Sequence, residues 1–311
     1  MQVAVVGSIT VDIVASGMPV DLVRGDKQEV LAIDLYPGGG AINATAMLLD
    51  QGEQVRLLGT VGQDALGLGL CAYLDAMGVD THAVRKLAGQ QTGKAVVLVG
   101  PQGDASVLAR RGANAYTQIH PQDLDVDLLY VAPLGAAPMD SLAQALAHGA
   151  SRAACWAVNP SVACVRQPDE AFRCVWDRAD VLSLNGVEAQ MLAAVPAGQI
   201  LADLPVAQAT ELAQHLQRRA GQAVLITLGA QGAVLVIDGQ PYFEPARRVA
   251  VRSTVGAGDA FNARFAQSWF RRRDPVLALR QATQASAQIL GQWAGNAWAP
   301  MWQDVDSGVW P

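Results

Sequence analysis

The chain has 311 residues, of which 51% are hydrophobic and 16% charged, a composition that fits a compact globular protein and argues against disorder or a coiled coil. Its 22 basic and 28 acidic residues leave a net charge of −6, so no global field would attract a nucleic acid. The sequence contains no long apolar run, no basic leader and only four scattered cysteines, so we expect neither secretion nor membrane association, but a reduced, cytoplasmic compartment.

Strands and helices are predicted to alternate along the chain. Short apolar runs typical of buried strands cover residues 3–6, 55–58, 95–99, 128–131, 155–158, 181–184, 224–227 and 233–237. Segments rich in alanine and leucine with helical spacing cover residues 41–49, 66–77, 139–147 and 206–219. This alternation predicts an α/β fold in which a mostly parallel central sheet is covered on both faces. We expect a single domain over residues 1–311.

Two stretches interrupt the alternation. Residues 12–36 have no helical period and mix glycine, proline and charged residues, whereas residues 94–109 resemble two short strands around a Pro-Gln-Gly-Asp turn. Both patterns favour antiparallel strands that stand off the main sheet. We therefore expect a small β lid, formed by insertions at about 12–36 and 94–109.

The segment Gly256-Ala257-Gly258-Asp259 lies between an extended stretch and a helix expected over residues 260–270. Small residues let a ligand approach the backbone, and the free N–H groups at a helix start stabilise an anion such as a phosphoryl group. A carboxylate beside that anion can accept the proton of an attacking hydroxyl. The alternative is an ordinary acidic residue in the first turn of a helix.

A second glycine cluster, residues 38–40, precedes another helix and Asn43. Close backbone approach together with an amide side chain suits a polyol, whose hydroxyls need both donors and acceptors. The alternative is a loop with a helix cap. Asp12 follows the first predicted strand, where ligands gather in open α/β sheets, although a turn or cap role is also common there.

These segments together resemble the ribokinase family, also called the PfkB carbohydrate kinases, over nearly the whole chain. The matching segments are residues 7–12 with Asp12, the GGxxxN motif of Gly38, Gly39 and Asn43, the G-x-V-G-x-D-x-x-G segment 59–67, the lid segments 92–95 and 112–115, the NxxE motif of Asn185 and Glu188, the T-x-G-x-x-G loop of Thr227, Gly229 and Gly232, and the GAGD segment. Several motifs in the family's order are far more specific than any one of them alone.

The resemblance implies a ribokinase-like α/β/α sandwich with a small β lid. It also implies an ATP-dependent kinase that phosphorylates a hydroxyl of a sugar or sugar-like molecule, with a homodimer through the lids as a further expectation. The implied roles are substrate binding by Asp12, Gly38, Gly39 and Asn43, nucleotide binding by Thr227, Gly229 and Gly232, contact through water with Mg²⁺ and the phosphates by Asn185 and Glu188, an anion hole at Gly256, Ala257 and Gly258, and a catalytic base at Asp259.

The chain also departs from the family pattern. Ser253 stands where many members have an aspartate, which makes a monovalent-cation site doubtful. Ribokinases have a lysine where this chain has Gly40 and an acidic sugar contact where it has residues 132–135, so ribose is not the expected acceptor.

Arg110 is predicted to bind substrate. If Arg110 or Arg111 points inward, an acidic or strongly hydrogen-bonding acceptor is favoured. The alternative is that both arginines belong to an exposed pair of strands.

Two other functions stay open on the sequence alone. One is a nucleoside kinase of the same family, which would share all these motifs. The other is a non-catalytic sugar- or nucleotide-binding protein that kept the fold without turnover.

Overall fold

A nine-stranded sheet forms the centre of the molecule, with strands in the order β13-β12-β11-β10-β9-β8-β1-β4-β5. The computed structural model describes residues 1–18, 25, 27–147 and 153–301. From β11 to β5 each strand is parallel to its neighbours, whereas β12 and β13 are antiparallel at one edge. The strands are Gln2–Val6 (β1), Gln54–Gly62 (β4), Val84–Leu87 (β5), Leu128–Val131 (β8), Cys155–Val158 (β9), Val181–Asn185 (β10), Ala223–Thr227 (β11), Ala233–Ile237 (β12) and Gln240–Glu244 (β13).

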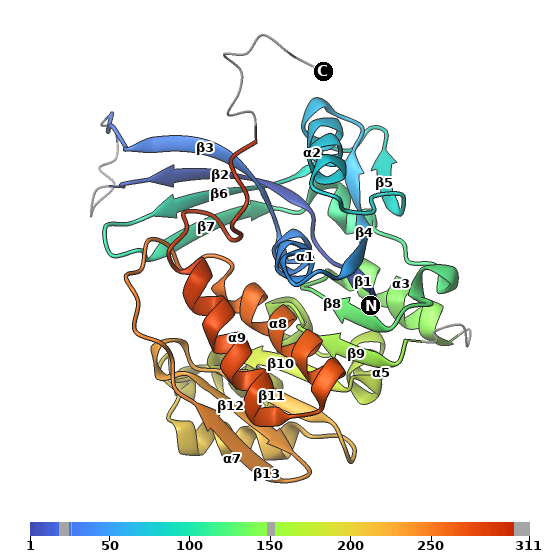
Figure 1. Cartoon of the computed structure of the whole chain (residues 1–311), viewed down its shortest axis with the longest axis vertical. Helices are drawn as coiled ribbons and strands as arrows, with labels where there is room; N and C mark the ends of the chain where they lie inside the picture. The colour runs from blue at the N-terminus through green and yellow to red at the C-terminus, as the bar shows by residue number, and fades with distance from the viewer. Residues whose placement is uncertain (19–24, 26, 148–152, 302–311) are drawn as a thin grey trace.

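Helices cover both faces of this sheet, so the predicted α/β/α sandwich is confirmed (Figure 1). Continuous apolar strands follow from this burial: all four residues of β8 are buried, for example. One face carries α1 (Gly40–Asp50), α2 (Ala65–Ala76), α8 (Ala257–Arg272) and α9 (Pro275–Ile289). The other carries α3 (Ala136–Ala147), α4 (Val162–Arg166), α5 (Glu170–Arg178), α6 (Gly186–Leu192) and α7 (Val206–Leu216). None of the described helices is long and apolar enough to cross a membrane.

Three helix boundaries differ by about one turn from the expected ones. Helix α3 begins at Ala136 rather than at residue 139. Helix α7 ends at Leu216 rather than at residue 219, because Gln217 takes an extended conformation with ψ 123°. Helix α8 begins at Ala257 rather than at residue 260, so part of the glycine-rich segment is already helical. Helices α5, α6 and α9 and strands β5 and β13 had no counterpart among the predicted elements.

A separate four-stranded sheet stands off one end of the large sheet, in the order β3-β2-β6-β7 (Figure 1). Its strands are Thr10–Ser16 (β2), Ala32–Gly38 (β3), Gly93–Val99 (β6) and Ala105–Arg110 (β7). The predicted antiparallel pairs β2–β3 and β6–β7 are present, and β2 joins them by pairing with β6 in parallel. Of the first predicted insertion, residues 19–24 and 26 lie outside the described residues.

The register of this second sheet separates two faces. Tyr36, Asp12, Ala95 and Ala109 form one row across it, and Leu35, Ile13, Val96 and Leu108 form the next row, on the opposite face. The face that carries Asp12 packs against Val255, Trp293 and Ala294 beside the start of α8. Asp12 therefore follows the first strand of the large sheet, as expected, and lies within β2 of the second sheet.

Candidate active site

The site forms around the first turn of α8. Gly256 is the N-cap of this helix, in the left-handed conformation with φ 72°, and no side chain caps the helix. A Cβ atom on Gly256 would lie 2.2 Å from the carbonyl oxygen of Gly295, so only glycine fits. Ala257, Gly258 and Asp259 form the first turn, where backbone N–H groups have no intrahelical partner. This end of the helix can therefore hold an anion.

Asp259 lies between the N-termini of two helices. Its Oδ2 accepts a hydrogen bond from Nδ2 of Asn43 at 2.8 Å. Its Oδ1 lies 3.4 Å from the position that a Cβ atom on Gly40, the first residue of α1, would occupy. Burial raises the pKa of Asp259, and the hydrogen bond from Asn43 opposes that rise. The result is a desolvated carboxylate with one oxygen held and the other toward the glycine cluster.

Asn43 was expected to bind hydroxyls of the acceptor. In the structure its side chain contacts two other side chains, those of Asp259 and Asn296. Its side-chain nitrogen donates to Asp259, and its oxygen accepts from Nδ2 of Asn296 at 3.1 Å. Asn43 is buried, so one N–H and one lone pair of the amide are all that remain for a ligand. In this structure the residue is first of all a partner of Asp259.

Asp12 is held beside the same glycine cluster. Its carboxylate accepts from the hydroxyl of Thr10 at 2.6 Å and from the backbone N–H of Gly39. A Cβ atom on Gly38 would lie 2.1 Å from the Asp12 carboxyl group, which explains the glycine there. Burial raises the pKa of Asp12 to about 6, and the charge of Asp259 adds to the rise. Two carboxylates thus share one small, desolvated region.

The residues expected to bind nucleotide lie at the carboxyl ends of β10 and β11, where the register pairs Asn185 with Thr227. Asn185 and Glu188 form a capping box at the start of α6: Oδ1 of Asn185 accepts from the N–H of Glu188 at 2.8 Å, and Oε2 of Glu188 accepts from the N–H of Asn185 at 2.9 Å. Burial and the charge of Asp259 raise the pKa of Glu188. Gly229 and Gly232 have φ values of 55° and 122°: the first favours glycine, and the second, where a Cβ would also meet the carbonyl oxygen of Glu244, requires it.

The two candidate arginines lie in different surroundings. Arg110 pairs with Lys94 across β6 and β7, on the face of the second sheet opposite Asp12, and its Nη1 donates to Oε1 of Gln91 at 3.1 Å. Arg110 thus lies on the face away from Asp12, and its contact with substrate stays a prediction. The Nη1 atom of Arg111 lies 3.4 Å from where a Cβ on Gly135 would stand, in the loop that follows β8.

Comparisons with known proteins agree with this geometry. The model of the pfkB family of carbohydrate kinases matches residues 1–299. The chain belongs to the pfkB family of carbohydrate kinases. Its curated relatives include a deoxyribokinase of Salmonella typhi, 26% identical over 296 residues that cover 92% of each chain, and a 2-dehydro-3-deoxygluconokinase of Thermoproteus tenax, 27% identical over 93% of this chain and 91% of the relative.

A solved structure supports the same fold for this pfkB-family kinase. The ribokinase of Cryptococcus neoformans, in complex with ADP, superposes with a TM-score of 0.74 at 21% identity and covers 99% of both chains. The family model and the curated kinases confirm the predicted family and a kinase activity, and this superposition supports the predicted ribokinase-like fold.

Sequence reasoning missed the segment that closes this kinase site from behind. Gly295 packs against Gly256, and Asn296 bonds to Asn43. Both residues belong to a tryptophan-rich C-terminal stretch, and such a composition indicates a segment that packs against the rest of the protein rather than one that forms part of a site. No local pattern distinguishes Asn296 from a surface asparagine, since its partners Pro37 and Asn43 lie more than two hundred residues earlier.

Proposed function

We propose that this kinase transfers the γ-phosphoryl group of ATP to a hydroxyl of a sugar or sugar-like molecule, with Asp259 as the general base. The observation that carries the proposal is the position of Asp259. It combines a half-buried carboxylate with the unpartnered N–H groups at the start of α8, so a proton acceptor and an anion site lie side by side.

The residues divide the work of an in-line transfer. Asp12 and the backbone of Gly38 and Gly39 orient the acceptor, so that one hydroxyl faces Oδ1 of Asp259. Asp259 takes the hydroxyl proton as the oxygen attacks, and the N–H groups of residues 256–258 stabilise the charge on the transferred group. The second sheet, which we propose acts as the lid, excludes water and so limits wasteful hydrolysis of ATP.

Glu188 and Asn185 fit a role beside Mg²⁺ and the phosphates. The buried Glu188 carboxylate uses Oε2 for the capping box, and no donor among the described residues contacts its Oε1. Hard oxygen ligands suit Mg²⁺, which keeps several waters and binds mainly through phosphates. Within the described ranges no group of three or more His, Cys, Asp or Glu side chains could hold a metal by itself. When bound, Mg²⁺ would neutralise charge on the transferring oxygens.

Arg111 favours an acceptor that carries an anionic or strongly hydrogen-bonding group. The loop with Gly135 also brings Pro133 against Gly40, and Gly40 adjoins Asp259. Within the described part of the chain the guanidinium forms no ion pair. A positive charge thus stands where ribokinases place an acidic sugar contact. A sugar acid or a phosphorylated sugar would supply the missing anion.

A panel of neutral sugars, nucleosides, sugar acids and sugar phosphates, assayed for ADP release, tests the acceptor class. We expect Arg111→Ala to raise the KM of an anionic acceptor roughly tenfold or more and to leave that of a neutral one within about twofold. Arg110→Ala is the matched control, because it removes the same charge from the opposite face. Equal effects of the two variants, or turnover of nucleosides alone, would contradict an acidic acceptor.

Asp259→Asn tests the base. We expect kcat to fall roughly 10²-fold or more while the Kd for ATP stays within a few-fold of that of the wild type, because only the proton acceptor is lost. A variant that keeps most of its kcat would refute the assignment.

We also propose that two copies associate through the face of the second sheet that turns away from Asp12. Ile33 and Leu108 on that face are 63% and 68% exposed, and Leu31 beside β3 is 73% exposed. Leu108 belongs to the apolar row that also contains Leu35, Ile13 and Val96, and Ile33 lies beside this row on the same face. A contiguous apolar patch on a lid sheet is typical of a protein–protein contact.

A further inference from the structure

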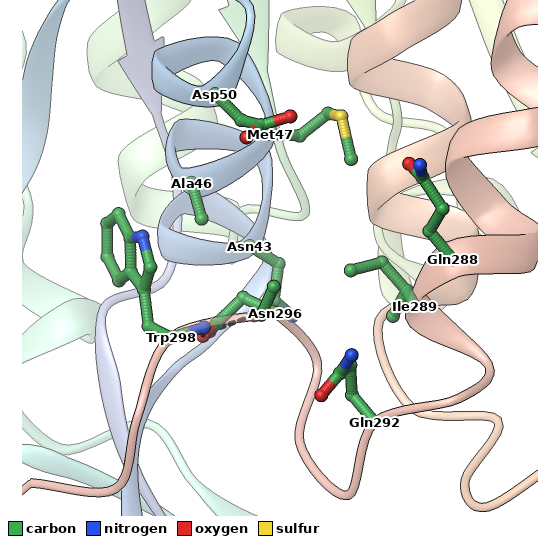
Figure 2. Close-up of a pocket in the computed structure, with 10 residues that line it drawn as sticks. Asn43, Ala46, Met47, Asp50, Gln288, Ile289, Gln292, Asn296 and Trp298 are labelled. Atoms are coloured by element: carbon green, nitrogen blue, oxygen red, sulfur yellow. Dashed lines mark hydrogen bonds between the residues drawn. The ribbon is translucent and has the colours of Figure 1, made fainter.

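Asn296 links the C-terminal segment to the proposed base. Its side chain is only 2% exposed. Its Nδ2 donates to the carbonyl oxygen of Pro37 at 2.9 Å and to Oδ1 of Asn43 at 3.1 Å, and its Oδ1 accepts from the backbone N–H of Trp298 at 3.1 Å. Figure 2 shows the contact between the two asparagines as a dashed line. All these contacts stay within the protein.

These bonds fix the direction of both amides. The backbone N–H of Trp298 can only donate and the carbonyl of Pro37 can only accept, so they determine which end of the Asn296 amide is which. Because Asn296 then presents a donor to Asn43, the oxygen of Asn43 must face Asn296. The nitrogen of Asn43 is left to face Asp259, where it donates to Oδ2 at 2.8 Å. A flipped Asn43 would set its oxygen against the carboxylate and its nitrogen against a second nitrogen.

We propose that Asn296 is a positioning residue for the phosphoryl transfer: through Asn43 it holds Oδ2 of Asp259, so that Oδ1 is the oxygen that receives the proton. This inference rests on the proposed role of Asp259. It extends the usual logic of a catalytic base that is oriented by a further group. Asn296 acts through Asn43 and touches no reacting atom.

The same chain of hydrogen bonds favours the ionised base. Asp12 of β2, Glu188 of α6 and Tyr130 of β8 also face Asp259 closely enough to interact with it electrostatically. The two carboxylates disfavour a negative charge on Asp259 and the buried phenol cannot neutralise it, so the donation from Asn43 is the interaction that supports the charge. If Asn43 lost its direction, the pKa of Asp259 would rise.

A hollow of about 510 Å³ lies directly behind the two asparagines, between α1 and the end of α9. Its walls are formed by Asn43, Ala46, Met47, Asp50, Gln288, Ile289, Gln292, Asn296, Ala297 and Trp298 (Figure 2). Replacing Asn296 by alanine removes a carboxamide that borders this hollow. Formamide, which has the size of the missing group, can therefore enter the space from solvent.

Asn296→Ala and Asn296→Leu test the inference together. We expect both to lower kcat roughly tenfold, to leave the KM of ATP and of the acceptor within about twofold, and to move the acid limb of kcat up by roughly one pH unit. Formamide should restore part of kcat in the alanine variant. It should do nothing for the leucine variant, whose side chain fills the space, and N,N-dimethylformamide, which has no N–H, should rescue neither.

Gln292→Ala is the matched control. It removes an amide that lines the same hollow but forms no hydrogen bond with Asn43 in the described structure, so the kinetics of this variant should equal those of the wild type. A fall in kcat with no shift of the acid limb and no formamide rescue would reduce Asn296 to a packing residue and overturn the inference. If the alanine variant does not fold, the pH profile of the leucine variant decides. Unchanged kinetics of Asn296 variants beside an inactive Asp259→Asn would refute only this inference, whereas an active Asp259→Asn would refute the proposed function itself.

Discussion

At the scale of single residues, the molecule keeps an ionisable group at Asp12 where ionisation is unfavourable. Folding raises the pKa of Asp12 from 3.8 to about 6, mainly by burial. The folded state therefore binds this proton more tightly than the unfolded state does. The associated stabilisation is complete below about pH 4 and is lost as the pH rises through 6. Such a cost is retained where a carboxylate has a task, and the task that we propose for Asp12 is the binding of acceptor hydroxyls.

Asp12→Asn should remove this pH dependence. Roughly two pKa units correspond to about 3 kcal/mol, so the free energy of unfolding of the wild type should fall relative to the variant by up to that amount between pH 4 and 7.5. Urea unfolding at both pH values measures the difference. The variant should also raise the KM of the acceptor far more than that of ATP. Parallel pH profiles of stability would show that Asp12 is not the titrating group.

Ser253 allows a prediction about monovalent cations. The residue is fully buried, and its hydroxyl accepts from the N–H of Val255 at 3.2 Å, so it supplies a weak oxygen dipole where many relatives have a full charge. A hard cation depends on the charge and number of its ligands. At fixed ionic strength, we expect activity to change less than about twofold when potassium replaces a large organic cation. Clear, saturable activation by potassium would contradict this.

At the scale of elements, the start of α6 has a structural role as a capping box and, as we propose, a second role beside Mg²⁺. Asn185 and Glu188 cap each other's backbone, and the same Glu188 carboxylate faces Asp259. An N-x-x-E pattern is also typical of the start of a helix. The capping role could therefore have been predicted from the sequence, although only the contact with Mg²⁺ and the phosphates was predicted.

Variants of Glu188 should separate these tasks. Glu188→Gln keeps an oxygen that can accept from the N–H of Asn185, so thermal stability should stay close to that of the wild type, while the Mg²⁺ concentration for half-maximal activity rises roughly tenfold. Glu188→Ala should lose both functions and cost about 1 kcal/mol of stability in addition. If the glutamine variant needs no more Mg²⁺ than the wild type, Glu188 has only the capping role.

The lid strands show why some site residues could not be predicted. Adjacent residues of a strand point to opposite faces, so an uncertainty of one residue in the strand decides whether Arg110 or Arg111 faces the site. The strand β7 ends at Arg110, and Arg111 already belongs to the turn before residues 112–116. Only the three-dimensional register resolves that choice. The start of α8 was misplaced because glycine is unfavourable within a helix, which predicted a loop through Gly258, whereas only Gly256 has the left-handed cap conformation and Gly258 is helical.

At the scale of the whole molecule, the fold was predictable because alternating buried strands and helices leave few arrangements. The parallel sheet then brings Asn185 and Thr227 together at one edge, as expected of strand ends. What could not be predicted is the closure of the site by distant segments. Asn296 meets Pro37 and Asn43 through tertiary packing alone, and no periodicity encodes such a contact.

The outward face of the second sheet allows a prediction about assembly. Leu108→Glu places a charge in the exposed apolar row and should convert the proposed dimer to a monomer, measured by light scattering after size exclusion. Phe243→Glu on β13 is the control, because Phe243 is also exposed, at 45%, but lies on the edge strand of the large sheet. A wild type that is monomeric at all concentrations, or a Leu108→Glu variant that remains dimeric, would contradict the proposed contact.

The close packing of Gly256 against Gly295 has a consequence for synthesis on the ribosome. Strands β1, β4 and β8 and the second sheet come from the first 131 residues and can begin to associate early, as chains fold from the N-terminus during translation. The turn that carries Asp259 is completed only when Gly295 and Asn296 have left the exit tunnel. On a nascent chain the proposed base is therefore in place only near the end of synthesis, and no phosphoryl transfer is expected before then.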